Sequence, residues 1–196
     1  MGLGKQAKVI NPKQVDALLH HVGKGRNGLR NKFIVLLSVR AGLRAKEIAA
    51  IRWSMVLDAS SDVGNEIHLT NVASKGNSGR VIPLNRQLRD VLIALYRTQP
   101  DRSGLTNIIT SERSQVTSAQ VIVNLFQRWY RDLGLVGCSS HSGRRTFITI
   151  TARKISTVGG SLLDVQPLAG HASLQTTQRY IEHNSDARKR VVEIVQ

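Results

Sequence analysis

Apolar residues recur at helical spacing along most of this 196-residue chain, and the period changes clearly at one place. Residues 66–72 (EIHLTNV) alternate between apolar and polar side chains, which is typical of a half-buried strand. Residues 73–79 (ASKGNSG) have the composition of a turn, and residues 80–82 can return antiparallel to the strand. We therefore expect a mainly α-helical domain with a small antiparallel β-sheet, and Lys75 near the tip of its hairpin.

Start signals and apolar spacing place the helices. Asn11-Pro12 is typical of a helix start, with an N-cap residue followed by proline, and Val15, Leu18 and Val22 follow at helical spacing. Thr117 and Gln120 have the spacing of a capping box before another helix. A short strand is expected at 107–110. The further helices are expected at 29–39, 45–53, 84–98, 121–133, 142–154, 162–169 and 174–184.

The charge balance favours a polyanionic partner. The formal net charge is +15, and arginine outnumbers lysine, which suits recognition of phosphate oxygens by the guanidinium fork. No apolar run reaches the 18 residues of a membrane span, and the first ten residues lack the apolar segment of a signal peptide. The single cysteine, Cys138, excludes a disulfide framework. We expect a cytoplasmic protein that binds nucleic acid and no membrane.

Several catalytic motifs are missing from the sequence. It contains no GxxxxGK[ST], no GxGxxG after a strand, no HExxH and no GxSxG. The carboxylates do not have the spacing of a divalent-metal nuclease, so neither a metal nor a cofactor is expected. Phosphate chemistry without a metal requires cationic side chains instead.

Such a set occurs in a fixed order along the chain: Arg44 in GLRxxE, Lys75 before RxIPL, His141 and Arg144 in HxxRxTF, and His171 and Tyr180 in LxGHxSxxTTxxY. This ordered series resembles the tyrosine recombinase family, also called the phage integrase family, over residues 11–184. The resemblance implies site-specific cutting and rejoining of DNA strands through a covalent 3′-phosphotyrosine and a Holliday junction, without metal or ATP.

The resemblance also implies a role for each residue. Arg44 and Arg144 would hold the non-bridging phosphate oxygens, and His171 would donate a further hydrogen bond. Tyr180 would be the nucleophile. The remaining roles are those of Lys75 as general acid, His141 as acceptor of the tyrosine proton, Glu47 as support for Arg44, and Lys46, Arg80, Arg145 and Arg179 as candidates for contacts with the DNA backbone.

The chain departs from the family pattern in two respects. Most members carry an N-terminal DNA-clamping domain of about a hundred residues, but here only 43 residues precede Arg44. On this resemblance, we expect the chain to be either a catalytic-domain fragment of a longer recombinase or a naturally short recombinase. The HSGRR motif also differs from the commoner HxLRH, because Gly143 replaces a leucine and Arg145 a histidine.

The expected organisation is a basic arm (1–10), a catalytic domain (11–184) and a tail (185–196) whose apolar residues pack on a neighbouring protomer or on their own domain. The expected partners are a double-stranded DNA site, three further copies in a tetramer on DNA, with a monomer in solution, and an accessory DNA-bending protein. The expected location is the bacterial cytoplasm, on nucleoid-associated DNA. Two alternatives stay open, a type IB topoisomerase and a non-catalytic DNA-binding protein with the same fold.

Overall fold

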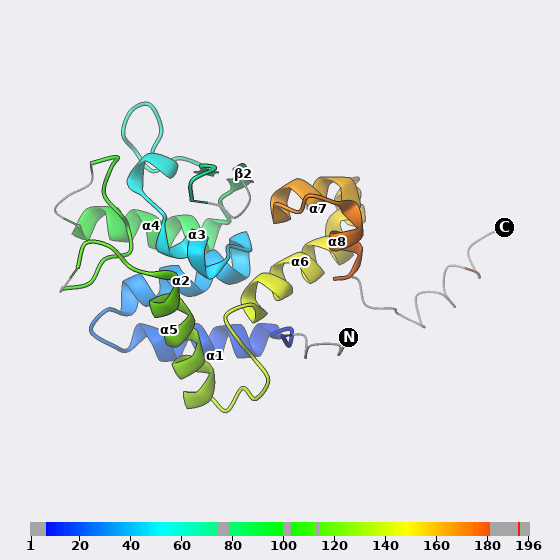
Figure 1. Cartoon of the computed structure of the whole chain (residues 1–196), viewed down its shortest axis with the longest axis horizontal. Helices are drawn as coiled ribbons and strands as arrows, with labels where there is room; N and C mark the ends of the chain where they lie inside the picture. Colours follow the sequence, from blue (N-terminus) through cyan, green and yellow to red (C-terminus); the bar gives the residue numbers. More distant parts are fainter. Residues whose placement is uncertain (1–6, 74–78, 100–102, 113, 181–191, 193–196) are drawn as a thin grey trace.

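The computed structural model describes residues 7–73, 79–99, 103–112, 114–180 and 192. In these ranges, one helix connects a larger body to a smaller group of helices (Figure 1). The body contains α1 (Pro12–Gly23), α2 (Gly28–Ala41), α3 (Ala45–Ala49), η1 (Trp53–Met55), β1 (Glu66–Leu69), β2 (Arg80–Pro83), α4 (Arg86–Thr98) and α5 (Ala119–Asp132). The connecting helix is α6 (Ser142–Lys154), and η2 (Ile155–Val158), α7 (Leu162–Ala169) and α8 (Leu174–Gln178) form the smaller group. The expected mainly helical fold with a small antiparallel sheet is confirmed.

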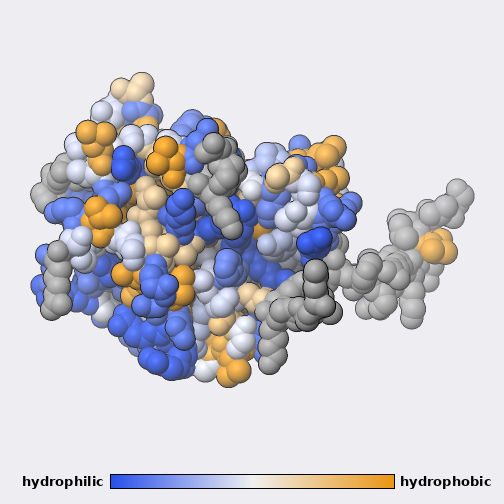
Figure 2. All heavy atoms as spheres, in the orientation of Figure 1, coloured by the Kyte–Doolittle hydropathy of each residue, from blue (hydrophilic) through white to orange (hydrophobic). Residues whose placement is uncertain are grey.

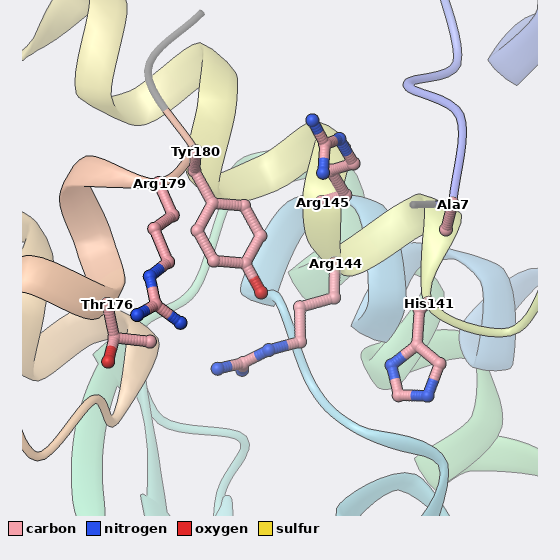
Figure 3. A pocket seen from close by; sticks show the side chains of 7 residues that line it. All are labelled: Ala7, His141, Arg144, Arg145, Thr176, Arg179 and Tyr180. Atoms are coloured by element: carbon pink, nitrogen blue, oxygen red, sulfur yellow. The ribbon is translucent and has the colours of Figure 1, made fainter. Parts of the chain in front are cut away.

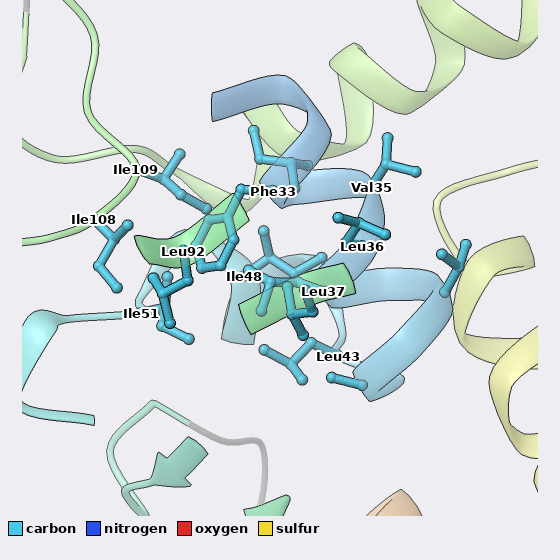
Figure 4. Close-up of a cluster of buried hydrophobic side chains, with 14 of the residues drawn as sticks. Phe33, Val35, Leu36, Leu37, Leu43, Ile48, Ile51, Leu92, Ile108 and Ile109 are labelled. Carbon is cyan, nitrogen blue, oxygen red and sulfur yellow. The ribbon is translucent and has the colours of Figure 1, made fainter. Parts of the chain in front are cut away.

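Helix α2 forms the centre of the body. Most of its residues are buried on every side, which is typical of a helix surrounded by other elements. Helices α1, α4 and α6 pack against it. Side chains from α2 and its neighbours form one continuous apolar core (Figure 4), which includes Phe33, Leu36, Ile48, Leu92 and Ile108. This core fixes the position of α3, the helix that Arg44 precedes.

Local signals explain where α1 begins. The Asn11 side chain accepts a hydrogen bond from the Gln14 backbone N–H at 2.9 Å, and the Gln14 side chain accepts one from the Asn11 N–H at 3.0 Å. Pro12 occupies the first helical position, where a missing N–H costs nothing. The expected helix start at Asn11-Pro12 is therefore confirmed.

The two strands form the expected antiparallel hairpin. Ile67 pairs with Ile82, and both side chains are buried against the body, while His68 and Val81 point outward. The strand is shorter than the expected 66–72, since pairing ends at Leu69 opposite Arg80. Lys75 and the expected hairpin tip lie outside the described residues.

The smaller group has its own apolar cluster, in which Ile148, Val165 and Ala169 are buried. Helix α6 joins it to the body by lying very close to α2. A Cβ atom on Gly143 would stand only 2.2 Å from the Ser38 Oγ, so glycine is required for this approach. The replacement of the family's leucine by Gly143 thus has a packing reason in this chain.

The expected helix at 45–53 is wrong in its second half. Helix α3 ends at Ala49, because the following residues pair with the segment near Asn107 instead. The Ile108 N–H donates to the Ile51 carbonyl at 3.0 Å, and the Trp53 N–H donates to the Thr106 carbonyl at 3.2 Å. The strand expected at 107–110 is reduced to one isolated bridge between Asn107 and Arg52.

The capping box expected at Thr117 and Gln120 is also wrong. Ser118 caps α5, and its side chain accepts from the Val121 N–H at 3.3 Å. The Thr117 hydroxyl instead donates to the Ile109 carbonyl at 2.8 Å. Two adjacent residues with the same capping chemistry offered two starts, and the tertiary contact of Thr117 decides between them.

The ends of the domain differ from expectation as well. The last residues of the expected loose arm are packed, because Ile10 is fully buried and its N–H donates to the Thr146 hydroxyl at 2.8 Å. Helix α8 ends at Gln178, so Tyr180 follows the helix and lies in a turn. The tail expected to pack on a neighbour lies outside the described residues except for Val192.

The surface in Figure 2 is largely hydrophilic, with separate apolar patches on the body and on the smaller group of helices. None of the described helices is both long and apolar enough to cross a membrane. Both tryptophans are buried in the core, with Trp53 and Trp129 at 0% and 3% exposure.

Candidate active site

The candidate site lies where the smaller group meets the body. Arg44 directly precedes α3, Arg144 lies in the first turn of α6, His171 lies between α7 and α8, and Tyr180 follows α8. A pocket of about 290 Å³ opens beside them. In Figure 3 the Tyr180 hydroxyl points toward the space that the guanidinium groups of Arg144 and Arg179 also face. The pocket is lined by Ala7, His141, Arg144, Arg145, Thr176, Arg179 and Tyr180.

Three arginines hold the end of α7 against the body. Arg80 Nε donates to the Leu168 carbonyl at 3.0 Å, Arg144 Nη2 to the Ala169 carbonyl at 2.6 Å, and Arg44 Nη2 to the Gly170 carbonyl at 3.4 Å. The last carbonyls of a helix have no partner within the helix, and they form its negative end. Three consecutive carbonyls therefore each accept from a different arginine. We call this set the α7 arginine clamp.

Arg144 also contacts the body through its second nitrogen. Its Nη1 donates to the Gly42 carbonyl at 2.6 Å, and the side chain is almost fully buried. Gly42 ends α2 in the left-handed conformation, with φ of 66°. Burial and the nearby Arg44 lower the pKa of Arg144, but an arginine stays protonated near neutral pH. Its remaining N–H groups have no partner among the described residues, and the side chain lines the pocket, so they can donate to an anion there.

Glu47 is the counter-charge of this cluster. It is fully buried and shares Oε1 between Arg44 Nη1 and Arg80 Nη1, each at 2.9 Å, while Oε2 accepts from Arg80 Nη2 at 3.1 Å. Oε2 also accepts from the Arg44 backbone N–H at 2.8 Å. Burial acts to raise the pKa of Glu47, but the hydrogen bonds and charges of Arg80 and Arg44 outweigh it and hold the pKa below its ordinary value. Glu47 thus fixes Arg44 from two directions.

The ring of Tyr180 lies between two cationic or polar groups. It stacks on the His171 ring with centroids 5.3 Å apart and planes at 26°. The Arg145 guanidinium carbon lies 5.8 Å from the centre of the Tyr180 ring, within range of a cation–π contact. The Tyr180 carbonyl accepts from the Thr149 hydroxyl at 3.2 Å. These contacts fix the ring and the backbone of Tyr180 beside the pocket.

His171 is neutral at physiological pH. Burial, followed by the charges of Arg144, Arg44 and Arg80, lowers its pKa to about 4. Its Nδ1 lies 3.0 Å from the Thr177 hydroxyl. A neutral imidazole carries one N–H donor and one acceptor, so His171 is suited to hydrogen bonding and not to charge pairing.

The structure distributes the expected site residues unequally. It brings Arg44, Arg144, His171 and Tyr180 together with Glu47. His141 precedes α6 as its N-cap residue, exposed and lining the pocket. Lys75 lies outside the described residues, so its place relative to the pocket is untested.

The four candidates for contacts with a DNA backbone also divide. Lys46 is exposed on α3, and Arg179 is exposed at the pocket. Arg145 is half-buried between the pocket and the Tyr180 ring. Arg80 does not fit the expected role, because its side chain is 5% exposed and all three guanidinium nitrogens donate within the protein. We assign Arg80 to the support of Glu47 and α7.

Sequence reasoning missed Thr149 and Thr177. Both are buried hydroxyl residues that contact the tyrosine or the histidine. Thr177 lies six residues after His171 in the TTQRY segment, and this spacing was the available signal. Over the residues that the structure describes, no group of three His, Cys, Asp or Glu side chains is arranged to hold a metal ion.

A mainly helical domain with a β-hairpin thus holds a tyrosine beside clustered arginines and a neutral histidine. The chain belongs to the Phage integrase family, whose sequence profile matches residues 8–187. It is 31% identical to tyrosine recombinase XerC of Shewanella sp. (strain ANA-3) over 90% of this chain and 57% of that protein. It is 29% identical to tyrosine recombinase XerC of Chlamydia pneumoniae over 83% of this chain and 50% of that protein. The chain spans about half the length of the curated relatives it matches.

Solved structures show the same fold. The integrase of the Tn1549 transposon, in complex with a circular intermediate DNA, matches with a TM-score of 0.73 and 16% identity, over 97% of this chain and 67% of that chain. The XerA recombinase matches with a TM-score of 0.71 and 18% identity, over 97% of this chain and 64% of that chain. The XerH recombinase bound to its difH substrate matches with a TM-score of 0.72 and 18% identity, over 99% and 56%.

Proposed function

We propose that this chain is the catalytic part of a site-specific DNA recombinase that cuts and rejoins strands through Tyr180. The observation that carries the proposal is the convergence of four side chains from separate elements. Tyr180 and Arg144 line one pocket, His171 stacks on Tyr180, and Arg44 and Arg144 donate to adjacent carbonyls at the end of α7. Membership of the family and the names of the XerC relatives support it. Solved neighbours whose titles describe DNA complexes support a DNA target.

The proposed reaction is a transfer of one phosphodiester to the protein and back. The Tyr180 oxygen attacks phosphorus and forms a 3′-phosphotyrosine, while the bond from phosphorus to the 5′-oxygen breaks. His141 takes the phenolic proton, and Lys75 gives a proton to the leaving 5′-oxygen. Each such proton transfer contributes typically about 10²–10⁴-fold in rate. The reverse attack by another 5′-hydroxyl rejoins the strand without ATP, because the ester bond is conserved.

The arginines and His171 would stabilise the negative charge that develops on the non-bridging phosphate oxygens. Arg44 and Arg144 offer N–H groups to the non-bridging oxygens, and His171 offers one more. Preorganisation is the key property here, since the clamp and Glu47 already fix both arginines before any DNA arrives. Donors held in place cost no reorganisation in the transition state.

The proposed recombinase function also implies an assembly on DNA. Recombination requires paired exchanges through a Holliday junction, so we propose four copies on paired DNA sites, a monomer in free solution, and an accessory DNA-bending protein, in the bacterial cytoplasm. We further propose that residues 185–196 pack on a neighbouring protomer or on their own domain. If deletion of 186–196 left both DNA-dependent assembly and the thermal stability of the monomer unchanged, this use of the tail would be wrong.

Covalent capture tests the central proposal. The protein is incubated with sheared genomic DNA of its host and any resident mobile element, trapped with SDS, and the attached DNA is sequenced. Tyr180→Phe is compared with Tyr96→Phe, a matched control whose hydroxyl bonds the Ser61 carbonyl on the body. We expect adducts with the wild type and Tyr96→Phe and none with Tyr180→Phe.

The other outcomes identify the alternatives. Adducts with Tyr180→Phe would mean that another nucleophile acts. Adducts accompanied by relaxation of supercoiled DNA, without strand exchange, would favour topoisomerase activity. Salt-sensitive DNA binding without any adduct would favour a non-catalytic DNA-binding protein.

A further inference from the structure

We propose that Thr177 fixes His171 in the tautomer that carries its proton on Nε2, so that His171 presents an N–H donor at the site. The assignment of Thr177 as a positioning residue rests on one contact, between its hydroxyl oxygen and His171 Nδ1 at 3.0 Å. Its relevance to catalysis rests on the proposed function, because the donor matters only where an anionic phosphate is to be bound.

The hydroxyl of Thr177 has one proton and needs one acceptor. Threonines in helices often donate to the carbonyl three or four residues earlier, but Thr177 makes no such bond. The side chain is fully buried, and His171 Nδ1 is its only hydrogen-bond partner among the described residues. A buried donor without an acceptor is costly, so the favourable arrangement has Thr177 donating and Nδ1 accepting.

Because the His171 ring is neutral, the hydrogen bond from Thr177 determines which ring nitrogen carries the proton. Burial of the ring, followed by the charges of the nearby arginines, lowers the pKa of His171 and keeps the ring neutral, so only one ring nitrogen carries a proton. If Nδ1 accepts from Thr177, the proton lies on Nε2. The opposite tautomer would leave a lone pair on Nε2, which repels a phosphate oxygen where a donor is needed. One hydroxyl therefore decides whether His171 attracts or repels the expected ligand.

Contacts other than the one with Thr177 also hold His171 in place. Its backbone N–H donates to the Gln166 carbonyl, and its backbone carbonyl accepts from the Gln166 side chain, each at 3.2 Å. The ring also stacks on Tyr180. Removing the Thr177 hydroxyl should thus change the tautomer more than the place of the ring. This separates a tautomer effect from a purely structural one.

The first test is spectroscopic and uses the full chain without DNA. Long-range proton–nitrogen correlations of ¹⁵N-labelled protein report which ring nitrogen of His171 carries hydrogen. We expect the Nε2–H pattern in the wild type and in Thr177→Ser, and a mixture or the Nδ1–H pattern in Thr177→Val. Thr157→Val is the matched control. Thr157 lies exposed in η2, and its hydroxyl donates to the carbonyl of Lys154, the last residue of α6.

The second test is kinetic. Single-turnover formation of the covalent adduct should fall about tenfold in Thr177→Val, less than the ~10²–10³-fold typical for complete loss of an oxyanion donor, and Thr177→Ser should restore it. In a His171→Ala background, Thr177→Val should have no further effect, because the pair acts through one donor. Independent, multiplicative effects of the two substitutions would contradict the proposal.

The two tests fail in different ways. An Nδ1–H pattern in the wild type, or an unchanged Nε2–H pattern in Thr177→Val, overturns the proposal whatever the protein does with DNA. The wild-type spectrum alone decides this if Thr177→Val does not fold. Absence of adducts in the wild type would overturn the proposed function, while the tautomer assignment would still be read from the spectrum.

Discussion

Arg80 and Glu47 form a buried ion pair with two parallel contacts, Nη1 to Oε1 at 2.9 Å and Nη2 to Oε2 at 3.1 Å. Glu47 is fully buried and the Arg80 side chain is 5% exposed. The pair links Arg80, the first residue of β2, to Glu47 in α3. Arg44, which directly precedes α3, is bound to the same carboxylate. Because both charges are buried away from water, removing one of them would leave the other without its main counter-charge.

Replacing Arg80 by methionine should therefore destabilise the protein strongly. The substitution leaves the Glu47 carboxylate with Arg44 as its remaining cation, and breaking a buried pair costs typically about 3–5 kcal/mol. Urea titration of the free energy of unfolding checks this. Arg80→Lys should recover part of the loss, since lysine keeps the charge but lacks the fork. Arg86→Met, at an exposed position on α4, should change stability by less than about 0.5 kcal/mol. Equal losses of stability in Arg80→Met and Arg86→Met would contradict a stabilising role of the buried ion pair.

The contact between Ser38 and Gly143 gives a second prediction. The Ser38 hydroxyl is buried and has no hydrogen-bond partner within the described residues, so Ser38→Ala should be neutral or stabilising. Gly143→Ala should cost about 1–3 kcal/mol, because its Cβ would meet the Ser38 Oγ at 2.2 Å. Denaturation of the single and double variants should show a smaller cost of Gly143→Ala in the Ser38→Ala background. Strict additivity would exclude direct contact as the cause.

The lowered pKa of His171 predicts acid sensitivity. The unfolded chain protonates this histidine near its ordinary pKa of 6.5, whereas the folded protein does so near 4. Between these values the unfolded state binds more protons, so stability is complete above about pH 6.5 and falls as the pH decreases toward 4. The slope should reach up to ~1.4 kcal/mol per pH unit for one proton.

Variants separate this effect from other titrations. His171→Asn should flatten the slope of unfolding free energy between pH 6.5 and 4.5, while His20→Asn, at an exposed position on α1, should leave it unchanged. Below that range Glu47 adds a second loss, because its folded pKa is also held below the ordinary 4.5. A slope in His171→Asn equal to that of the wild type would refute the assignment to His171.

DNA binding should weaken steeply between about 50 and 300 mM salt, because each neutralised phosphate releases counterions. Arg179 is exposed at the pocket, so Arg179→Ala should reduce the slope of log K against log salt by about 1. Fluorescence anisotropy of a labelled duplex measures both. Arg26→Ala is the control. Arg26 lies in the loop between α1 and α2, at the other end of the molecule from α8 (Figure 1), and it forms an ion pair with Glu112.

Local patterns predicted much of this architecture. The bounds of α6 and α7, the start of α1 at Asn11 and the alternation of the hairpin strands all follow from spacing and caps over a few residues. Helix α3 did not follow, because its helical pattern continues past Ala49 while the chain pairs with a segment more than fifty residues later. Competition between local propensity and a distant partner is not visible in a local window.

The candidate site shows the same division. Residue types and their order, through the resemblance to the tyrosine recombinases, predicted Arg44, Arg144, His171 and Tyr180 as a group, and the fold brings these four residues close together. The role of Arg80 was beyond such reasoning. An arginine on a strand can face solvent or a buried carboxylate, and only the fold brings Glu47 within reach. Thr177 was missed for a similar reason. Its partner His171 lies in the loop before α8, and only the fold of this segment brings the hydroxyl to the imidazole ring.

The α7 arginine clamp ties the geometry of the candidate site to the position of α7. All three contacts cross from the carbonyls of α7 to arginines of the body or of α6, so undocking of α7 would dissolve the site as one unit. The apparent dissociation constant for a phosphate equals the intrinsic one divided by the fraction of molecules in the docked arrangement. By reciprocity, a bound phosphate draws the ensemble toward docking. We therefore expect substitutions that loosen the clamp, even far from the pocket, to weaken the proposed DNA binding without contacting a nucleotide.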